Sequence, residues 1–300
     1  MKKQHFLLMA AAMIMVSSCN RLDVIGMGIN RSDTEERVAD WIDYNNQFGM
    51  PVIEDAPDEY CVYSCSDSHY AQRDSIVPQS DKDLLYKYIT VERNDPMALF
   101  AIHAGDMVNE SGKTGFIMTR GAVLYNAETQ ADKDPCFFVI GNHDVYYDCA
   151  QYFKKYFHTS TYTVIVKTVS GYQDLFIFLD SGNGTFGKRQ LEWLEEQLEH
   201  RNEYRHCMVI SHNWLFRTSY NYTTTPAANL PEDEQYAFMD LMSRSNVDMV
   251  IMGHFHAREQ RQFGGVQYVM TDNLNDDEAT PSYLVVNVGE KVRYEYEELQ

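Results

Sequence analysis

The sequence predicts an α/β fold with mixed strands, and three features of the chain support this prediction. Short apolar runs, such as residues 60–66 and 207–211, alternate with amphipathic stretches after Asp58. Near-continuous apolar runs are typical of strands buried on both faces, and the stretches between them indicate crossover helices. The third feature is size, because 300 residues with 44% hydrophobic side chains can bury a substantial core without stabilising disulfide bonds or structural metal ions.

The individual elements follow from hydrophobic periodicity. An amphipathic helix is predicted at residues 35–45, ahead of the main domain. Apolar runs predict core strands at residues 60–66, 97–104, 136–140, 175–179, 207–211 and 247–252. Stretches with a single apolar face predict covering helices at residues 187–200 and 231–243. The C-terminal part predicts strands at residues 268–272, 283–288 and 292–297, with the last two joined as a hairpin.

The N-terminal residues have the layout of a secretory signal. Lys2 and Lys3 precede an apolar run at residues 6–16 that is too short to span a bilayer. Residues 16–19 resemble the cleavage box of bacterial lipoproteins, which predicts lipidation of Cys19; the alternative is an ordinary signal peptide that contains a cysteine. We therefore expect a lipoprotein signal peptide at residues 1–18, a tether with the N-terminal helix at 19–57 and the main domain at 58–300.

This N-terminal pattern also predicts where the protein resides. An acylated Cys19 would anchor the domain to a membrane, so we expect a lipid-anchored protein of the cell envelope, either periplasmic or surface-exposed. Five further cysteines follow Cys19, an odd number without a CxxC pair, and they do not indicate a disulfide framework.

The charge balance restricts the partners of the protein. With 44 acidic and 25 basic side chains, the formal charge is −19. Long-range attraction to a nucleic-acid backbone is therefore not expected. A small phosphorylated substrate would need a local positive centre.

Ionisable side chains collect directly after five of the predicted strands. Ligands of open α/β sheets bind at the carboxyl ends of strands, so these positions carry more weight than others. The glycines beside them allow the tight turns that such ends require. The clusters are Asp67-Ser68-His69, Gly105-Asp106, Gly141-Asn142-His143-Asp144, Ser211-His212 and Gly253-His254-Phe255-His256.

The chemistry of these side chains points to metal ions. Carboxylates, imidazoles and one amide, without a thiolate, favour a catalytic site for divalent ions such as Mn, Fe, Ni, Co or Zn over a closed cysteine-zinc knot. One ion cannot use so many ligands. We therefore expect two divalent metal ions that share a bridging carboxylate.

In order, spacing and strand context, the five clusters resemble the motifs of the calcineurin-like metallophosphoesterases, from about residue 60 to the C-terminus. The resemblance implies a four-layer α-β-β-α sandwich of two mixed sheets, with a dinuclear metal site at the strand carboxyl ends. It implies one ion held by Asp67, His69, Asp106 and His256. It implies a second ion held by Asp106, Asn142, His212 and His254, with Asp106 as the bridge.

The same resemblance implies a hydrolase that acts on phosphoric esters. A hydroxide bridging the two ions would attack a phosphomonoester or phosphodiester, and His143 would assist the leaving group while Asp144 orients it. Purple acid phosphatases carry a tyrosine where Asn109 stands, so a tyrosinate-iron site is not expected. Two alternatives remain: a nuclease acting on short nucleic acid, and a non-catalytic envelope lipoprotein with a metal-binding site.

Overall fold

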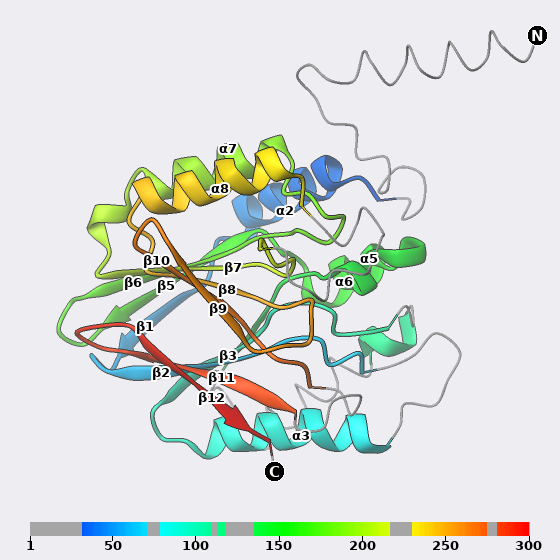
Figure 1. The fold of residues 1–300 in the computed structure, drawn as a ribbon, viewed down its shortest axis with the longest axis horizontal. Helices are drawn as coiled ribbons and strands as arrows, with labels where there is room; N and C mark the ends of the chain where they lie inside the picture. The colour runs from blue at the N-terminus through cyan, green and yellow to red at the C-terminus, as the bar shows by residue number, and fades with distance from the viewer. Residues whose placement is uncertain are drawn as a thin grey trace, which may run out of the picture.

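The computed structural model describes residues 32–70, 79–109, 113–117, 135–216, 230–274 and 281–299, with the backbone alone at 79–83 (Figure 1). Two mixed sheets pack face to face, and helices cover the outer face of each sheet. The predicted four-layer α-β-β-α sandwich is thus confirmed. The signal peptide and Cys19 lie outside the described residues.

The larger sheet brings four strand ends to the same edge. Its order is β1-β5-β6-β7-β8-β10-β9, and β6, β7, β8 and β10 run parallel to one another. The bounds of its strands, in chain order, are β1 (Val52–Ala56), β5 (Tyr162–Thr168), β6 (Gln173–Phe178), β7 (His206–Ile210), β8 (Met249–Met252), β9 (Glu259–Phe263) and β10 (Val266–Met270).

The smaller sheet contributes three more parallel strands. Its order is β12-β11-β2-β3-β4, in which β2, β3 and β4 are parallel. The predicted C-terminal hairpin is confirmed as the antiparallel pair β11 and β12. The strand bounds are β2 (Tyr60–Cys65), β3 (Ala98–His103), β4 (Cys136–Phe138), β11 (Ser282–Val288) and β12 (Arg293–Glu298).

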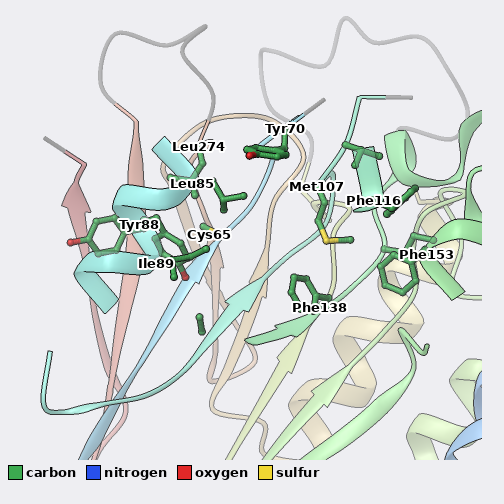
Figure 2. Close-up of a cluster of buried hydrophobic side chains, with 14 of the residues drawn as sticks. Cys65, Tyr70, Leu85, Tyr88, Ile89, Met107, Phe116, Phe138, Phe153 and Leu274 are labelled. Carbon is green, nitrogen blue, oxygen red and sulfur yellow. The ribbon is translucent and has the colours of Figure 1, made fainter. Parts of the chain in front are cut away.

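Three apolar layers hold the sandwich together. Between the sheets, Phe100 of β3 meets Phe176 of β6 edge to face, with ring centroids 5.0 Å apart. Helices α2 (Thr34–Phe48), α7 (Lys188–Leu198) and α8 (Glu232–Arg244) lie over the larger sheet, and α3 (Gln79–Asn94) covers the smaller one (Figure 1). Figure 2 shows Leu85 and Tyr88 of α3 beside Cys65 of β2, and each is at most 1% exposed. Burying side chains of this size stabilises the fold by about 2–3 kcal/mol each.

The three helices predicted from the sequence, at 35–45, 187–200 and 231–243, differ from α2, α7 and α8 by a few residues at most. The bounds of the described helices are α2 (Thr34–Phe48), α3 (Gln79–Asn94), α5 (Asn142–Val145), α6 (Ala150–Phe157), α7 (Lys188–Leu198) and α8 (Glu232–Arg244), with 3-10 turns η2 (Tyr146–Asp148) and η3 (Arg201–Glu203). Helix α2 begins after Asp33, whose carboxylate accepts a hydrogen bond from the Glu36 amide at 3.1 Å. In the described part of the chain, no helix is long and apolar enough to cross a membrane.

Several elements were not predicted from the sequence. Strand β9 is almost entirely polar and exposed, and its pairing with β10 determines its structure. Helices α3 and α6 and strand β5 were also missed. Strand β1 pairs with β5, so the larger sheet includes residues that the sequence analysis assigns to the tether.

Candidate metal centre

The five polar clusters meet where the carboxyl ends of the two sheets face each other. Asp67 and His69 follow β2, Asp106 follows β3 and Asn142 opens α5 after β4. On the larger sheet, His212 follows β7, while His254 and His256 follow β8. Strands β2, β3 and β4 are parallel, and so are β7 and β8, so the carboxyl ends within each sheet lie side by side. The ends of β2 and β3 are joined directly, because the Asp67 amide donates a hydrogen bond to the Gly105 carbonyl at 3.0 Å.

Two aspartates join the sheets across the site. Oδ2 of Asp67 accepts a hydrogen bond from the His254 amide at 2.9 Å. Oδ2 of Asp106 lies 3.2 Å from Nε2 of His212. Both carboxylates come from the smaller sheet and both partners from the larger one, so the aspartates connect the two halves of the candidate centre.

Three overlapping groups of side chains could each hold an ion, since within each group the ligand atoms lie within 4.8 Å of one another. Among the described residues, the first group is Asp67, His69 and His256, and the second is Asp106, His212 and His254. The division of the ligands between two ions stays a prediction. A third group joins His69 and Asp106 to His143, a residue that the sequence analysis places outside the ligand shell. The amide oxygen of Asn142 lies 3.1 Å from Nε2 of His212.

The histidine pairs fit metal ions by their chemistry. Nε2 of His69 lies 3.2 Å from Nε2 of His256, and Nδ1 of His254 lies 3.3 Å from Nε2 of His212. Nitrogens at such separations can both bind one ion at about 2.1 Å. His212 is already oriented for this role, because its Nδ1 lies 2.8 Å from the Ala104 carbonyl oxygen and donates to it. The donor set therefore fits two divalent cations.

The backbone of the centre is unusually strained. Five of the seven predicted ligands have positive φ angles between 41° and 87°, namely Asp67, His69, Asp106, His254 and His256. Residues other than glycine adopt this region at a cost of about 1–2 kcal/mol each, and such residues cluster at functional sites. The fold thus stores strain at the positions that aim side chains into the centre.

The motif glycines allow the clusters to approach one another. A Cβ atom on Gly141 would lie 2.2 Å from Oδ1 of Asp106, and one on Gly253 would lie 2.7 Å from Oδ2 of Asp67. At Gly105, where φ is 94°, a Cβ atom would lie 2.5 Å from the His212 ring. Each glycine leaves space for a ligand from another strand end.

The electrostatics of the centre favour ionised carboxylates. Burial opposes ionisation of Asp106, but the positive charge of His212 holds its pKa well below the usual range. Burial likewise opposes protonation of His212, yet the charge and hydrogen bond of Asp106 raise its pKa to about 9. Burial also opposes ionisation of Asp67, but the hydrogen bond with His256 and the charges of His256 and His212 together hold its pKa below the usual range. Anionic oxygens are therefore available to cations in the buried site.

His143 lies beside the candidate metal ligands His69 and Asp106. Its amide donates to Oδ1 of Asp106 at 2.8 Å, and its half-buried ring meets His69 edge to face at 4.8 Å. The ring is also 5.2 Å from that of Tyr146. This placement leaves the imidazole beside both predicted ion positions and within reach of solvent.

Asp144 organises the backbone of two loops. Its Oδ2 accepts from the Gly141 amide at 2.9 Å and its Oδ1 accepts from the Val108 amide at 3.0 Å. Burial and the nearby charge of Asp106 raise the pKa of Asp144 to about 7, although these hydrogen bonds act in the opposite direction. Orientation of His143 by Asp144 stays a prediction.

Other buried residues that support the centre were not identified from the sequence. The Ser181 hydroxyl accepts from the backbone amides of His212 and Asn213, at 3.3 and 2.9 Å, and so holds the loop after β7. Nε2 of His103 lies 2.9 Å from the Ser68 hydroxyl, inside the first motif. His103 lies inside the apolar run predicted at 97–104 and not directly after it, so the pattern of polar residues at strand ends did not identify it.

A buried ion pair connects α2 to the same region. Arg37 donates to the Asp180 carboxylate through Nε at 3.0 Å and Nη2 at 2.7 Å, and both side chains are buried. The Asp180 carboxylate also accepts from the Gly182 amide at 2.7 Å, and the Asp180 amide donates to Gln190 at 2.8 Å. The N-terminal helix is thereby fastened to the strand end that precedes Ser181.

Comparisons with known proteins agree with this geometry. Residues 62–258 match the family described as calcineurin-like phosphoesterase. No curated protein matches the chain in sequence. Among solved structures, a dimetal phosphatase from Danio rerio is similar at 11% identity and a TM-score of 0.59, over 80% of this chain and 98% of that one.

Two further structures show how varied proteins with this fold are. Purple acid phosphatase PPD1 from yellow lupin is similar at 14% identity and a TM-score of 0.62, over 81% of this chain and 52% of that one. GAP50, the anchor in the inner membrane complex of Plasmodium, is similar at 13% identity and a TM-score of 0.58, over 81% and 85%. At these identities the likeness concerns the fold alone.

Proposed function

Since this chain belongs to the calcineurin-like phosphoesterases, and is thus a metal-dependent hydrolase of phosphoric esters, we propose that it cleaves a small phosphomonoester or phosphodiester. The observation that carries the proposal is the convergence of carboxylates and imidazoles from five strand ends into one centre. Divalent ions bound there supply Lewis-acid activation of water and of the phosphoryl oxygens. The acidic chain, at −19, otherwise offers little attraction to a phosphate.

Different side chains of the centre would bind the ions and assist the leaving group. Asp67, His69, Asp106 and His256 would hold one ion, and Asp106, Asn142, His212 and His254 the other. The half-buried His143 lies beside these ligands, and its amide donates a hydrogen bond to Asp106. From there its imidazolium would donate a proton to the departing oxygen, which lowers the barrier most for poor leaving groups.

The most direct test is an activity screen of the purified protein. Phosphate monoesters and diesters would be assayed with Mn, Zn, Ni or Fe, and the Asp106→Asn variant would control for contaminating hydrolases. We expect hydrolysis of small esters that depends on added metal and is lost in Asp106→Asn. Activity that survives in Asp106→Asn would show that the candidate metal centre is not the source of the hydrolysis. Activity confined to oligonucleotides would favour the nuclease alternative. Metal binding without turnover of any ester would favour the non-catalytic alternative.

We also propose that the chain is anchored to the cell envelope through acylated Cys19. The support is the charged and apolar layout of residues 1–16 followed by the Val-Ser-Ser-Cys box. In cells, the wild-type protein is expected in the membrane fraction and Cys19→Ser in the soluble fraction. Equal partition of both, with a mature N-terminus other than Cys19, would support the ordinary signal peptide instead.

A further inference from the structure

The amide side chain of Asn142 poses a problem of orientation. A carboxamide presents an oxygen on one side and an NH₂ group on the other, and only the oxygen can bind a cation. Asn142 is 3% exposed, and its Oδ1 points toward Nε2 of His212 at 3.1 Å. The side chain must keep this orientation for the ion between Asp106, His212 and His254.

The contact with His212 cannot maintain that orientation in the loaded protein. Nδ1 of His212 donates to the Ala104 carbonyl, so Nε2 is the nitrogen that would face the ion. A nitrogen whose lone pair binds a cation carries no proton and donates no hydrogen bond. The Asn142 oxygen then exchanges this donor for the cation, so an orientation set before the ion arrives depends on a contact at the amide nitrogen.

The other end of the amide has such a contact. Nδ2 of Asn142 donates a hydrogen bond to the hydroxyl oxygen of Tyr146 at 3.3 Å. Tyr146 lies one helical turn further along, at the junction of α5 and η2, and its half-buried ring packs edge to face on His143 at 5.2 Å. This bond uses the amide nitrogen, which cannot bind a cation, so it does not compete with the ion for the amide oxygen.

We propose that Tyr146 is a positioning residue that selects the metal-binding orientation of the Asn142 amide. A hydrogen bond that orients a ligand typically changes metal affinity by about 10- to 100-fold when it is removed. The proposal rests on the metal-dependent function above and assigns a role to a residue outside the ligand shell. It also gives a role to the tyrosine that lies two residues after the third cluster, at the junction of two short helices.

Tyr146→Phe tests the proposal, because it removes the hydroxyl and keeps the ring. Metal-free protein would be titrated with Mn²⁺ by calorimetry and by electron paramagnetic resonance. We expect one of the two binding steps to weaken by about tenfold while the other stays within twofold of the wild type. Excess Mn²⁺ should restore kcat with an unchanged KM. Tyr236→Phe, an exposed tyrosine on α8, is the matched control and should change neither step.

A second variant separates orientation from general packing. In Asn142→Asp, the two carboxylate oxygens are equivalent, so adding Tyr146→Phe should change Mn²⁺ affinity by less than threefold. Three results would each overturn the proposal. One is a tenfold loss of Mn²⁺ affinity when Tyr146→Phe is added to Asn142→Asp. The others are equal weakening of both binding steps, or unchanged Mn²⁺ affinity, in Tyr146→Phe alone. The thermal midpoint of the metal-free protein reports folding separately. If the wild type binds none of Mn²⁺, Zn²⁺, Ni²⁺ and Fe²⁺, the proposed function itself fails.

Discussion

Adding one methyl group at Gly141 should disable the metal centre through steric contact alone. The Cβ atom of Gly141→Ala would lie 2.2 Å from Oδ1 and 2.3 Å from the amide nitrogen of Asp106, so this contact must open by about 1 Å to reach ordinary van der Waals distance. Gly141 has φ −104° and ψ −178°, which any residue adopts without strain. The effect is therefore a displacement of Asp106 or of the turn that carries Asn142.

The expected losses follow from that displacement. Overpacking by one methyl group costs about 1–3 kcal/mol of stability. A shift of about 1 Å at a catalytic group costs about 100-fold in turnover. We expect Gly141→Ala to bind metal at least tenfold more weakly and to hydrolyse nitrophenyl phosphate about 100-fold more slowly, as measured by metal titration and steady-state kinetics.

Gly171→Ala is the matched control for this experiment. Gly171 has φ 87°, and a Cβ atom there would meet nothing within 4 Å. The variant should lose about 1–2 kcal/mol of stability to backbone strain and keep its metal affinity. Wild-type metal affinity and turnover in Gly141→Ala would refute the steric reasoning.

Three further predictions concern other parts of the molecule. His143→Asn should keep both metal-binding steps and lower kcat by about 10²- to 10⁴-fold for alkyl phosphates, with a smaller loss for nitrophenyl phosphates, which leave without a proton; equal losses, or loss of an ion, would remove the proton-donor role. Arg37→Met leaves the buried Asp180 carboxylate without its guanidinium and should lower the free energy of unfolding in urea by about 3–5 kcal/mol. The double variant Arg37→Met/Asp180→Leu should lose less, and an equal or larger loss would contradict this account. Burial opposes protonation of His206, but its hydrogen bonds to Asp248 and the Gly289 carbonyl raise its pKa above 6.5. Its charged form therefore stabilises the fold below about pH 6.5, and this contribution disappears as the pH rises through the raised pKa. The thermal midpoint should fall more steeply above about pH 6.5 in the wild type than in His206→Gln, and parallel curves would disprove the assignment.

The candidate centre could be predicted from the sequence because its signal is local. A buried parallel strand needs an apolar run, and a ligand at its carboxyl end appears as a polar side chain directly after that run. Asp67, Asp106 and His212 follow this pattern, and the adjacent glycines mark where the loops approach. Parallel pairing places the strand ends of each sheet side by side, and the packing of the two sheets brings both sets of ends together.

The parts that could not be predicted depend on tertiary contacts. The five residues of β9 carry almost no apolar signal, and β9 is a strand because β10 offers a free edge. Ser181 and His103 support the centre through hydrogen bonds to residues more than 30 positions away, which no local pattern reveals. The contacts of Asp144 were missed for the same reason, because it accepts hydrogen bonds from the amides of Met107 and Val108 on another loop.

The stoichiometry of bound metal in the wild type and in Asp106→Asn tests the central claim most directly. A centre in which Asp106 is shared by both ligand sets predicts two ions per wild-type chain and fewer than one in the variant, with loss of esterase activity. Two tightly bound ions and full activity in Asp106→Asn would contradict the account.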